Sequence, residues 1–196
     1  MTEPNPRAGR RVLLAITGLF FLPVVAALVW YIWAPSLAPP PSTHGTLVDP
    51  ARALQPFRIE RSGQAPYTLD DLRGRWVLLN VIGEDCGESC IKRVHDTRQI
   101  RLALDKDTNR VRRVALAPQG RATPGLASIL DRHPELTVLA SGPDGPLAGQ
   151  LPGGSPVGAV FIIDPHGNVV LRYAPDMAAD GILDDLQKLL KLSRIG

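Results

Sequence analysis

The chain has 196 residues, a formal net charge of +3 and only two cysteines. Two of the three net positive charges belong to residues 1–33, where Arg7, Arg10 and Arg11 stand against Glu3. The rest of the chain is therefore almost neutral and contains no recognisable base- or phosphate-binding motif, which argues against a nucleic-acid-binding protein.

The N-terminal segment has the pattern of a membrane anchor. Residues 12–33 contain no charged side chain, and about 20 apolar residues are needed to cross a bilayer. The segment ends with Trp30, Tyr31 and Trp33, aromatic residues that favour the membrane interface. A secretory signal usually has a shorter apolar core of ~7–15 residues. We therefore interpret residues 12–33 as an uncleaved transmembrane helix, with a cleaved signal as the alternative.

The charges around this segment predict its orientation. The arginines precede the span, so the positive-inside rule predicts a cytoplasmic stub at residues 1–11. The remainder then lies outside, which in a bacterium places a single-pass protein in the inner membrane with its C-terminal domain in the periplasm. That compartment permits disulfides. A proline-rich stretch at residues 34–45 predicts an extended spacer, and residues 46–196 are long enough for one domain with its own core.

Within this domain, strand and helix patterns alternate. Apolar runs predict strands at residues 57–59, 76–81, 111–116, 136–140, 157–163 and 169–173. Apolar residues spaced by three or four predict helices from about Cys86 to Leu104, over residues 124–131 and over residues 179–192. Thr68 and Asp71 form a capping-box pattern for one further short helix. Residues 164–167 predict the turn of a hairpin. The alternation favours a partly parallel α/β sheet.

The two cysteines, Cys86 and Cys90, follow the buried strand at residues 76–81. A separation of four residues places them one helical turn apart, with Cα atoms roughly 6 Å apart, which is within disulfide range. Two thiolates at this separation can also bind one soft metal ion such as Cu(I). A dithiol at a strand-to-helix turn narrows the fold class to a thioredoxin-like domain, a central mixed sheet flanked by helices.

The cysteine pair allows three roles. As a redox pair, Cys86 is the exposed nucleophile at a helix N-terminus, where the dipole favours the thiolate, and Cys90 is the resolving thiol. As a metal site, the pair holds Cu(I) through two sulfurs. The third role is inert, either as two buried small hydrophobic residues or as a structural disulfide. Glu84, Asp85 and Glu88 nearby raise the thiol pKa if close and favour a cation; the other reading is a solvated loop.

The sequence resembles the Sco/SenC family of membrane-anchored, thioredoxin-fold proteins linked to cytochrome c oxidase assembly. The anchor and spacer, residues 68–80, the Cys86-x-x-x-Cys90 motif and residues 161–167 carry this resemblance. It implies a respiratory oxidase subunit, or another periplasmic thiol protein, as the partner and Cu(I) as a candidate cargo. Two positions differ from the family pattern. Gly87 replaces the usual proline, and Pro156 stands where the family has a third copper ligand, a histidine.

The place of Pro156 corresponds to the cis-proline that packs against the dithiol in thioredoxins, so this resemblance implies a cis bond before Pro156. Other donors do not fill the third ligand position in this interpretation. His166 lies in the hairpin turn, His95 and His133 are assigned to surface or loop roles, and Met177 is assigned to packing. His44, in the spacer, is the one histidine that could fold back.

The sequence therefore predicts a Sco-like, membrane-anchored periplasmic factor in cytochrome c oxidase assembly. It acts through Cys86 and Cys90 by thiol redox chemistry, Cu(I) handling or both. A general periplasmic thiol–disulfide oxidoreductase and a redox-inactive scaffold remain as alternatives.

Overall fold

The computed structural model describes residues 6–33, 43–61, 63–84, 86–118, 124–141, 145–193 and 195. The chain divides into two compact units, Met1–Ser42 and Thr43–Gly196. The first unit contains helix α1 (Pro6–Trp33). Within the part of the chain that the structure describes, no helix has the length and apolarity that a membrane crossing requires.

The second unit is built on a six-stranded mixed sheet with the order β1-β8-β7-β4-β5-β6. β4, β5 and β6 are parallel, whereas β7, β8 and β1 are joined by antiparallel pairings. A separate two-stranded sheet pairs β2 with β3. The strands are β1 (Thr46–Ala53), β2 (Arg58–Arg61), β3 (Gln64–Thr68), β4 (Trp76–Val81), β5 (Val111–Ala117), β6 (Thr137–Ala140), β7 (Val160–Ile163) and β8 (Asn168–Tyr173).

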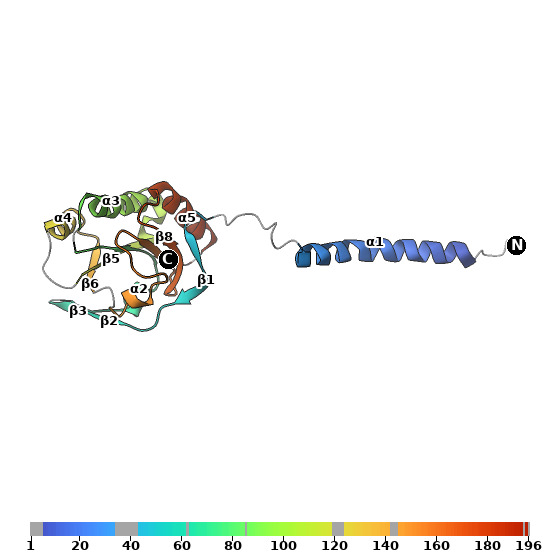
Figure 1. Cartoon of the computed structure of the whole chain (residues 1–196), viewed down its shortest axis with the longest axis horizontal. Helices are drawn as coiled ribbons and strands as arrows, with labels where there is room; N and C mark the ends of the chain where they lie inside the picture. Colours follow the sequence, from blue (N-terminus) through green and yellow to red (C-terminus); the bar gives the residue numbers. More distant parts are fainter. Residues whose placement is uncertain are drawn as a thin grey trace. The chain divides into compact units, whose positions relative to one another are not determined.

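Helices cover one face of the main sheet. α3 (Glu88–Leu102) and α5 (Ala179–Leu192) lie together on this face (Figure 1). Their apolar side chains join alternate residues of the central strands, such as Trp76 and Leu78 of β4, in one buried cluster. Because side chains alternate along a strand, the intervening residues of β4 must face the opposite side.

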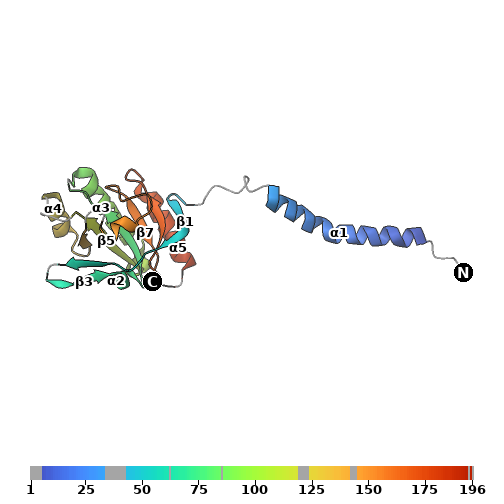
Figure 2. The ribbon, with the colours of Figure 1, turned by 60° about the horizontal axis from the view of Figure 1, so that its bottom comes forward.

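The opposite face is covered by the β2–β3 hairpin and the short helix α2 (Leu69–Leu72) (Figure 2). Val77, Leu79 and Val81 pack there against buried side chains of that hairpin and of α2. All six residues of β4 are therefore buried, as the continuous apolar run predicts for a strand covered on both faces. β4 is the rigid central strand that ends at the cysteine motif.

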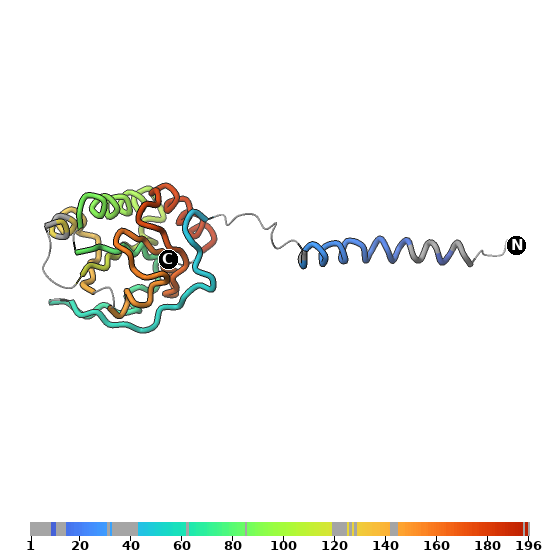
Figure 3. The backbone as a smooth tube through the Cα atoms, viewed as in Figure 1, coloured from blue at the N-terminus to red at the C-terminus, as the bar shows by residue number. Residues whose placement is uncertain are grey.

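The start of the domain is held beside α5, as the tube in Figure 3 shows. The buried carboxylate of Asp185 accepts hydrogen bonds from the backbone N–H groups of His44 and Gly45, at 2.8 and 2.9 Å, and from the hydroxyl of Tyr173 at 3.1 Å. Gly45 is required at this point because a Cβ would lie 2.6 Å from the Tyr173 ring. These contacts hold His44 and Gly45 against the C-terminal helix and β8.

Most predicted elements are confirmed. The predicted strand at residues 76–81 and helix at residues 179–192 match β4 and α5, and α4 (Pro124–Arg132) extends the predicted helix by one residue. The turn at residues 164–167 is present, with the Asp164 carboxylate accepting the N–H groups of His166 and Asn168. The Asp71 carboxylate accepts the Thr68 N–H at 2.7 Å, as the capping box predicts.

Three elements were not predicted. They are β1, β3 and the 3-10 helix η2 (Asp105–Arg110). β1 and β3 each contain a proline; β1 is almost wholly exposed and β3 has one buried residue, so neither has the apolar pattern of a buried strand. η2 has no buried residue and is formed by a polar segment whose sequence resembles a loop.

Candidate functional site

The cysteine motif lies where β4 ends and α3 begins. Val81 is the last residue of β4, and its neighbour Ile82 is held to the parallel strand by a hydrogen bond from its N–H to the carbonyl of Leu116. Cys86 and Cys90 form a disulfide with their Cα atoms 5.2 Å apart. The described fold therefore brings the two sulfurs together at the carboxyl end of the central strand.

α3 begins at Glu88, with Gly87 as its N-cap, so the helix starts two residues later than the sequence predicts. Cys86 therefore precedes the helix, and Cys90 is its third residue. The Gly87 carbonyl accepts the first helical hydrogen bond, from the Ile91 N–H at 3.1 Å. The first-turn N–H groups and the helix dipole favour negative charge at this end of α3, and Cys90 lies within that turn.

Both cysteines are buried. Cys86 is 6% exposed and Cys90 is 5% exposed, so the prediction that Cys86 would be an exposed nucleophile is wrong. The cause is α4, which the sequence did not place over the motif. The disulfide lies in an apolar cluster formed by residues of α3, α4 and the sheet, among them Val94, Ile129 and Ala115.

Gly125, in the first turn of α4, makes the closest approach to the motif. A Cβ at Gly125 would collide with the carbonyl oxygen of Cys86 and would lie 3.3 Å from the Cys86 Cβ. Only glycine lets the α4 backbone lie this close. Sequence reasoning missed this residue because it carries no chemical group; the pair Pro124-Gly125 at the start of a short helix was the only signal.

The predicted cis bond before Pro156 is wrong. Among the described residues, the cis peptide bond is the one between Asp49 and Pro50. The Pro156 carbonyl instead accepts the Ala159 N–H at 3.0 Å, closing a turn in which Gly158 has φ +83°. A glycine with positive φ at the third position of such a turn reverses the chain, so the sharp bend needs no cis bond. This turn also explains why β7 begins at Val160 and not at Val157.

The turn still reaches the cysteine loop, but through Val157. The Val81 carbonyl accepts the Gly158 N–H at 2.9 Å, and the Ala159 carbonyl accepts the Val81 N–H at 3.0 Å. A Cβ at Gly83 would lie 2.7 Å from the Val157 Cγ2. Val157 thus packs on the loop that precedes Cys86. Gly83 and Val157 also line a largely apolar cavity of about 240 Å³, together with the buried Ser141.

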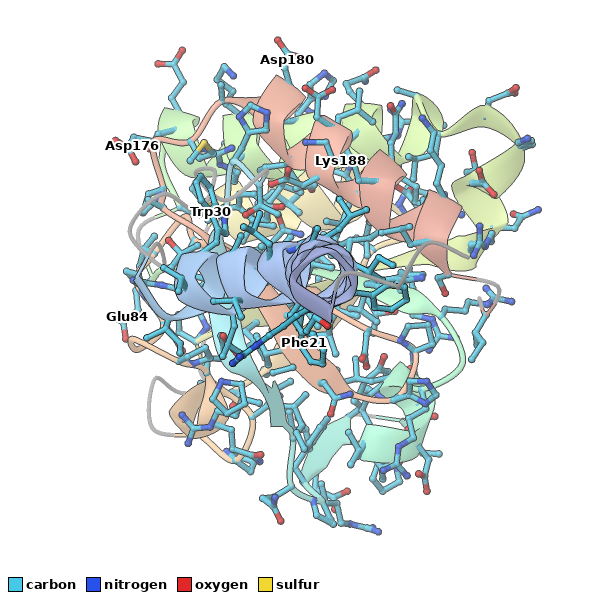
Figure 4. All side chains as sticks on the ribbon, turned by 90° about the vertical axis from the view of Figure 1, so that its right-hand side faces the viewer. Phe21, Trp30, Glu84, Asp176, Asp180 and Lys188 are labelled. Carbon is cyan, nitrogen blue, oxygen red and sulfur yellow. A yellow bond between two sulfur atoms is a disulfide. The ribbon has the colours of Figure 1, made fainter. Side chains whose placement is uncertain are left out.

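The described acidic residues beside the motif, Glu84 and Glu88, are exposed, and Glu84 is seen on its loop in Figure 4. Asp85 lies outside the described residues. Glu88 occupies the first turn of α3, where its charge complements the helix dipole. Both carboxylates are therefore solvated, Glu84 on the loop and Glu88 on the first turn of the helix.

No described residue supplies a third metal ligand beside the cysteines. Within the described ranges, no group of three or more His, Cys, Asp or Glu side chains has the arrangement of a metal site. His44 lies near Asp184 at 3.6 Å, and His95 faces His133 with ring centroids 6.4 Å apart. Met177 is partly buried and packs against the apolar cluster between the helices and the sheet, as expected. The donors present therefore do not fit the three-ligand copper site that the family resemblance implies.

A buried arginine, paired with a partly exposed glutamate, holds α3 against the sheet. The Arg113 guanidinium, on β5, donates to Glu135 at 2.6 Å and to the Thr97 hydroxyl at 3.1 Å, and its side chain is fully buried. Burial lowers the pKa of Arg113 to about 10, which leaves it charged at neutral pH. Burial acts to raise the pKa of Glu135, but a backbone hydrogen bond and the charge of Arg113 outweigh it and lower that pKa.

Comparison with known proteins identifies the fold. A family model described as "Transmembrane-like, thioredoxin-like, C-terminal domain" matches residues 76–193. No curated protein sequence matches the chain. Apo Sco1 from Thermus thermophilus, a solved structure, superposes with a TM-score of 0.60 at 22% identity, covering 76% of this chain and 97% of that one.

Two further solved structures agree. Yeast Sco1 with copper bound has a TM-score of 0.57 at 16% identity, and the match covers 71% of this chain and 92% of the yeast chain. BsSco, described as a member of the Sco family of cytochrome c oxidase assembly proteins with a disulfide switch, has a TM-score of 0.54 at 15% identity, with coverage of 76% and 98%. These likenesses confirm a thioredoxin-like α/β fold, which the chain shares with Sco proteins.

Proposed function

Because the chain belongs to the transmembrane-like, thioredoxin-like C-terminal domain family, we propose that it is a membrane-anchored thiol–disulfide exchange factor. Its site is the Cys86–Cys90 pair, its partner is a periplasmic thiol protein, and its setting is the assembly of a respiratory oxidase. The observation that carries the proposal is the closed disulfide at the end of β4. Such a short loop gains little stability from a disulfide, which favours an exchange role over a structural one.

The exchange is balanced in two steps. A partner thiolate attacks the sulfur of Cys86, forms a mixed disulfide with it and expels Cys90 as a thiolate. A second partner thiol then attacks the mixed disulfide and releases Cys86. The partner is oxidised to a disulfide, and its two protons end on Cys86 and Cys90. Cys90 is the better leaving group because it lies in the first turn of α3, where the thiolate is stabilised.

The oxidase setting is supported by the fold likeness to Sco proteins, one of which is described by its title as a cytochrome c oxidase assembly protein. A second candidate function is Cu(I) handling, favoured by the copper-bound Sco structures of the same fold. After reduction, Cys86 and Cys90 offer two soft thiolates, which are suited to Cu(I). An anaerobic Cu(I) competition titration of the reduced chain tests this candidate, and C86S/C90S is its control.

The N-terminal segment supports an anchored protein. Residues 12–33 are free of charge in the sequence and belong to the helix α1, so we propose a single inner-membrane span with residues 1–11 in the cytoplasm. Alkaline phosphatase fused after Gly196 should be active, because the enzyme requires export to form its disulfides. An inactive alkaline phosphatase fusion, together with a fluorescent fusion to green fluorescent protein at the same position, would contradict this topology.

Trapping the mixed disulfide tests the exchange. In Cys90→Ser, the Cys86 thiolate attacks the disulfide of an oxidised partner and expels one partner thiolate, which is the reverse of the second step. Because Cys90 is no longer present to displace the partner, the mixed disulfide should persist in cells, visible as a reductant-sensitive band. C86S/C90S is the control and should trap nothing. If Cys90→Ser traps no protein and C86S/C90S leaves oxidase assembly intact, the chain is a redox-inactive scaffold and the proposal is wrong.

A further inference from the structure

A surface groove of about 590 Å³ lies between α3 and the C-terminal end of α4, and it starts at the first turn of α3, the turn to which the buried Cys90 belongs. Three of its lining residues are cationic, namely Lys92, Arg98 and Arg132, and Glu88 is its one acidic residue. His95 and His133 complete its polar lining. The groove is thus positively charged, although the chain outside residues 1–33 is almost neutral.

We propose that this groove binds an acidic peptide segment of the thiol partner and so brings the partner's cysteine to the dithiol. The inference rests on the proposed exchange function and adds to it the chemistry of the partner. Carboxylates are the complementary charge for the groove, and complementary charge raises the rate and specificity of encounter.

The polar lining includes one buried group without a partner. His133 is 3% exposed, and its Nδ1 has no hydrogen-bond partner among the described residues. Burial lowers the pKa of His133, and the charges of Arg113 and Arg98 lower it further. The charge of Glu135 acts in the opposite direction. The net positive charge of the groove therefore comes from Lys92, Arg98 and Arg132, and not from His133.

The cationic residues are free to exchange partners. Lys92 pairs with Asp96 at 2.8 Å and its side chain is 72% exposed, while Arg98 is 3.8 Å from Glu135 and its side chain is 42% exposed. Exposed pairs of this kind contribute little stability. An incoming carboxylate can therefore replace Asp96 or Glu135 without a large cost to the fold.

The groove has the length of a short peptide. Its α3 wall runs from Glu88 to Arg98 on one face of the helix, about 15 Å at ~1.5 Å per residue. An extended chain rises ~3.3 Å per residue, so about four or five acidic residues cover it. A cysteine next to this segment is then delivered to the end of α3 that holds Cys90.

The binding experiment uses the full oxidised chain in phosphatidylcholine nanodiscs and a fluorescein-labelled peptide, Gly-Glu-Asp-Glu-Asp-Gly, which lacks cysteine. Fluorescence anisotropy should show binding that weakens with added salt, and the Gln/Asn version of the peptide should bind at least tenfold more weakly. K92E/R132E should reduce the affinity at least tenfold. K106E/K191E makes the same charge change outside the groove and should change the affinity less than threefold.

The peptide has no thiol, so this assay does not depend on disulfide exchange. If Cys90→Ser traps a partner but the acidic peptide does not bind, the groove inference fails and the exchange function stands. Equal losses in K92E/R132E and K106E/K191E would also overturn it, because net charge alone would then explain the binding. If phosphatidylglycerol vesicles capture the nanodiscs and the peptide does not bind, the groove inference is also wrong. The groove would then bind an anionic lipid surface and not an acidic peptide.

Discussion

At the scale of single residues, the position of α3 depends on a charge that has no access to water. Arg113 is fully buried and pairs with Glu135, which is one-third exposed. Removing the Glu135 carboxylate leaves the buried Arg113 guanidinium with neutral hydrogen-bond acceptors only. A buried charge that loses its counter-charge destabilises the folded state. We expect Glu135→Gln to lower the free energy of unfolding by about 1–2 kcal/mol at pH 7, measured by urea denaturation.

The same pair gives stability a pH dependence. The pKa of Glu135 is lowered by folding, so its contribution is present above the unfolded value of about 4.3 and is lost as the pH falls through the folded value. The difference between Glu135→Gln and the wild type should therefore narrow from pH 7 toward pH 3. Glu60→Gln, at an exposed pair with Arg58, should have little effect at either pH. A difference that widens in acid would contradict this account.

Gly125 controls access to the disulfide. Gly125→Ala places a Cβ against the Cys86 carbonyl, so the first turn of α4 must move away from the cysteines. We expect reduction by dithiothreitol to become at least fivefold faster, with a loss of stability of about 1–3 kcal/mol from overpacking.

Gly87→Ala is the matched control for this variant. Gly87 also neighbours Cys86, but its φ is −77° and nothing lies within 4 Å of a Cβ there. It should leave the reduction rate within twofold of the wild type. Equal rates in Gly125→Ala and the wild type would show that α4 does not limit access.

At the scale of elements, the turn before β7 and the loop after β4 pack as one unit. Gly83→Ala forces a Cβ into the methyl groups of Val157, at 2.7 and 2.9 Å, and should cost about 1–3 kcal/mol in unfolding free energy. Val157→Ala removes those methyl groups and should cost little alone, because Val157 is 52% exposed. The double variant should be more stable than Gly83→Ala. Additive losses in this double-mutant cycle would show that the two residues do not interact.

The elements near the site were predictable to different degrees. β4 could be predicted because a run of apolar residues is typical of a strand buried on both faces, and α5 because its apolar residues repeat at helical spacing. The start of α3 was placed two residues early, since Gly87 acts as an N-cap through its backbone and has no side chain to reveal it. The turn before β7 was predicted wrongly, because the sequence suggested a cis bond before Pro156. The bend depends instead on the positive φ of Gly158.

At the scale of the whole molecule, the thioredoxin-like fold was predictable and the burial of the site was not. The order of strands and helices, and the position of the cysteines after the first central strand, can be predicted from the residue pattern within each short stretch of sequence. Burial of Cys86 depends on α4, which follows about forty residues later in the chain and packs through Gly125 and Ile129. Long-range packing of this kind leaves no signal near the cysteines.

The central claim is that the Cys86–Cys90 disulfide exchanges with thiols, and its equilibrium reduction potential tests this most directly. The measurement equilibrates the full chain with glutathione or dithiothreitol buffers and quantifies the free thiols. An exchange factor should have a potential between about −180 and −300 mV, whereas structural disulfides lie below about −300 mV. We predict a value within the first range. A value well below −300 mV, or a disulfide that no buffer reduces in the folded protein, would contradict the account.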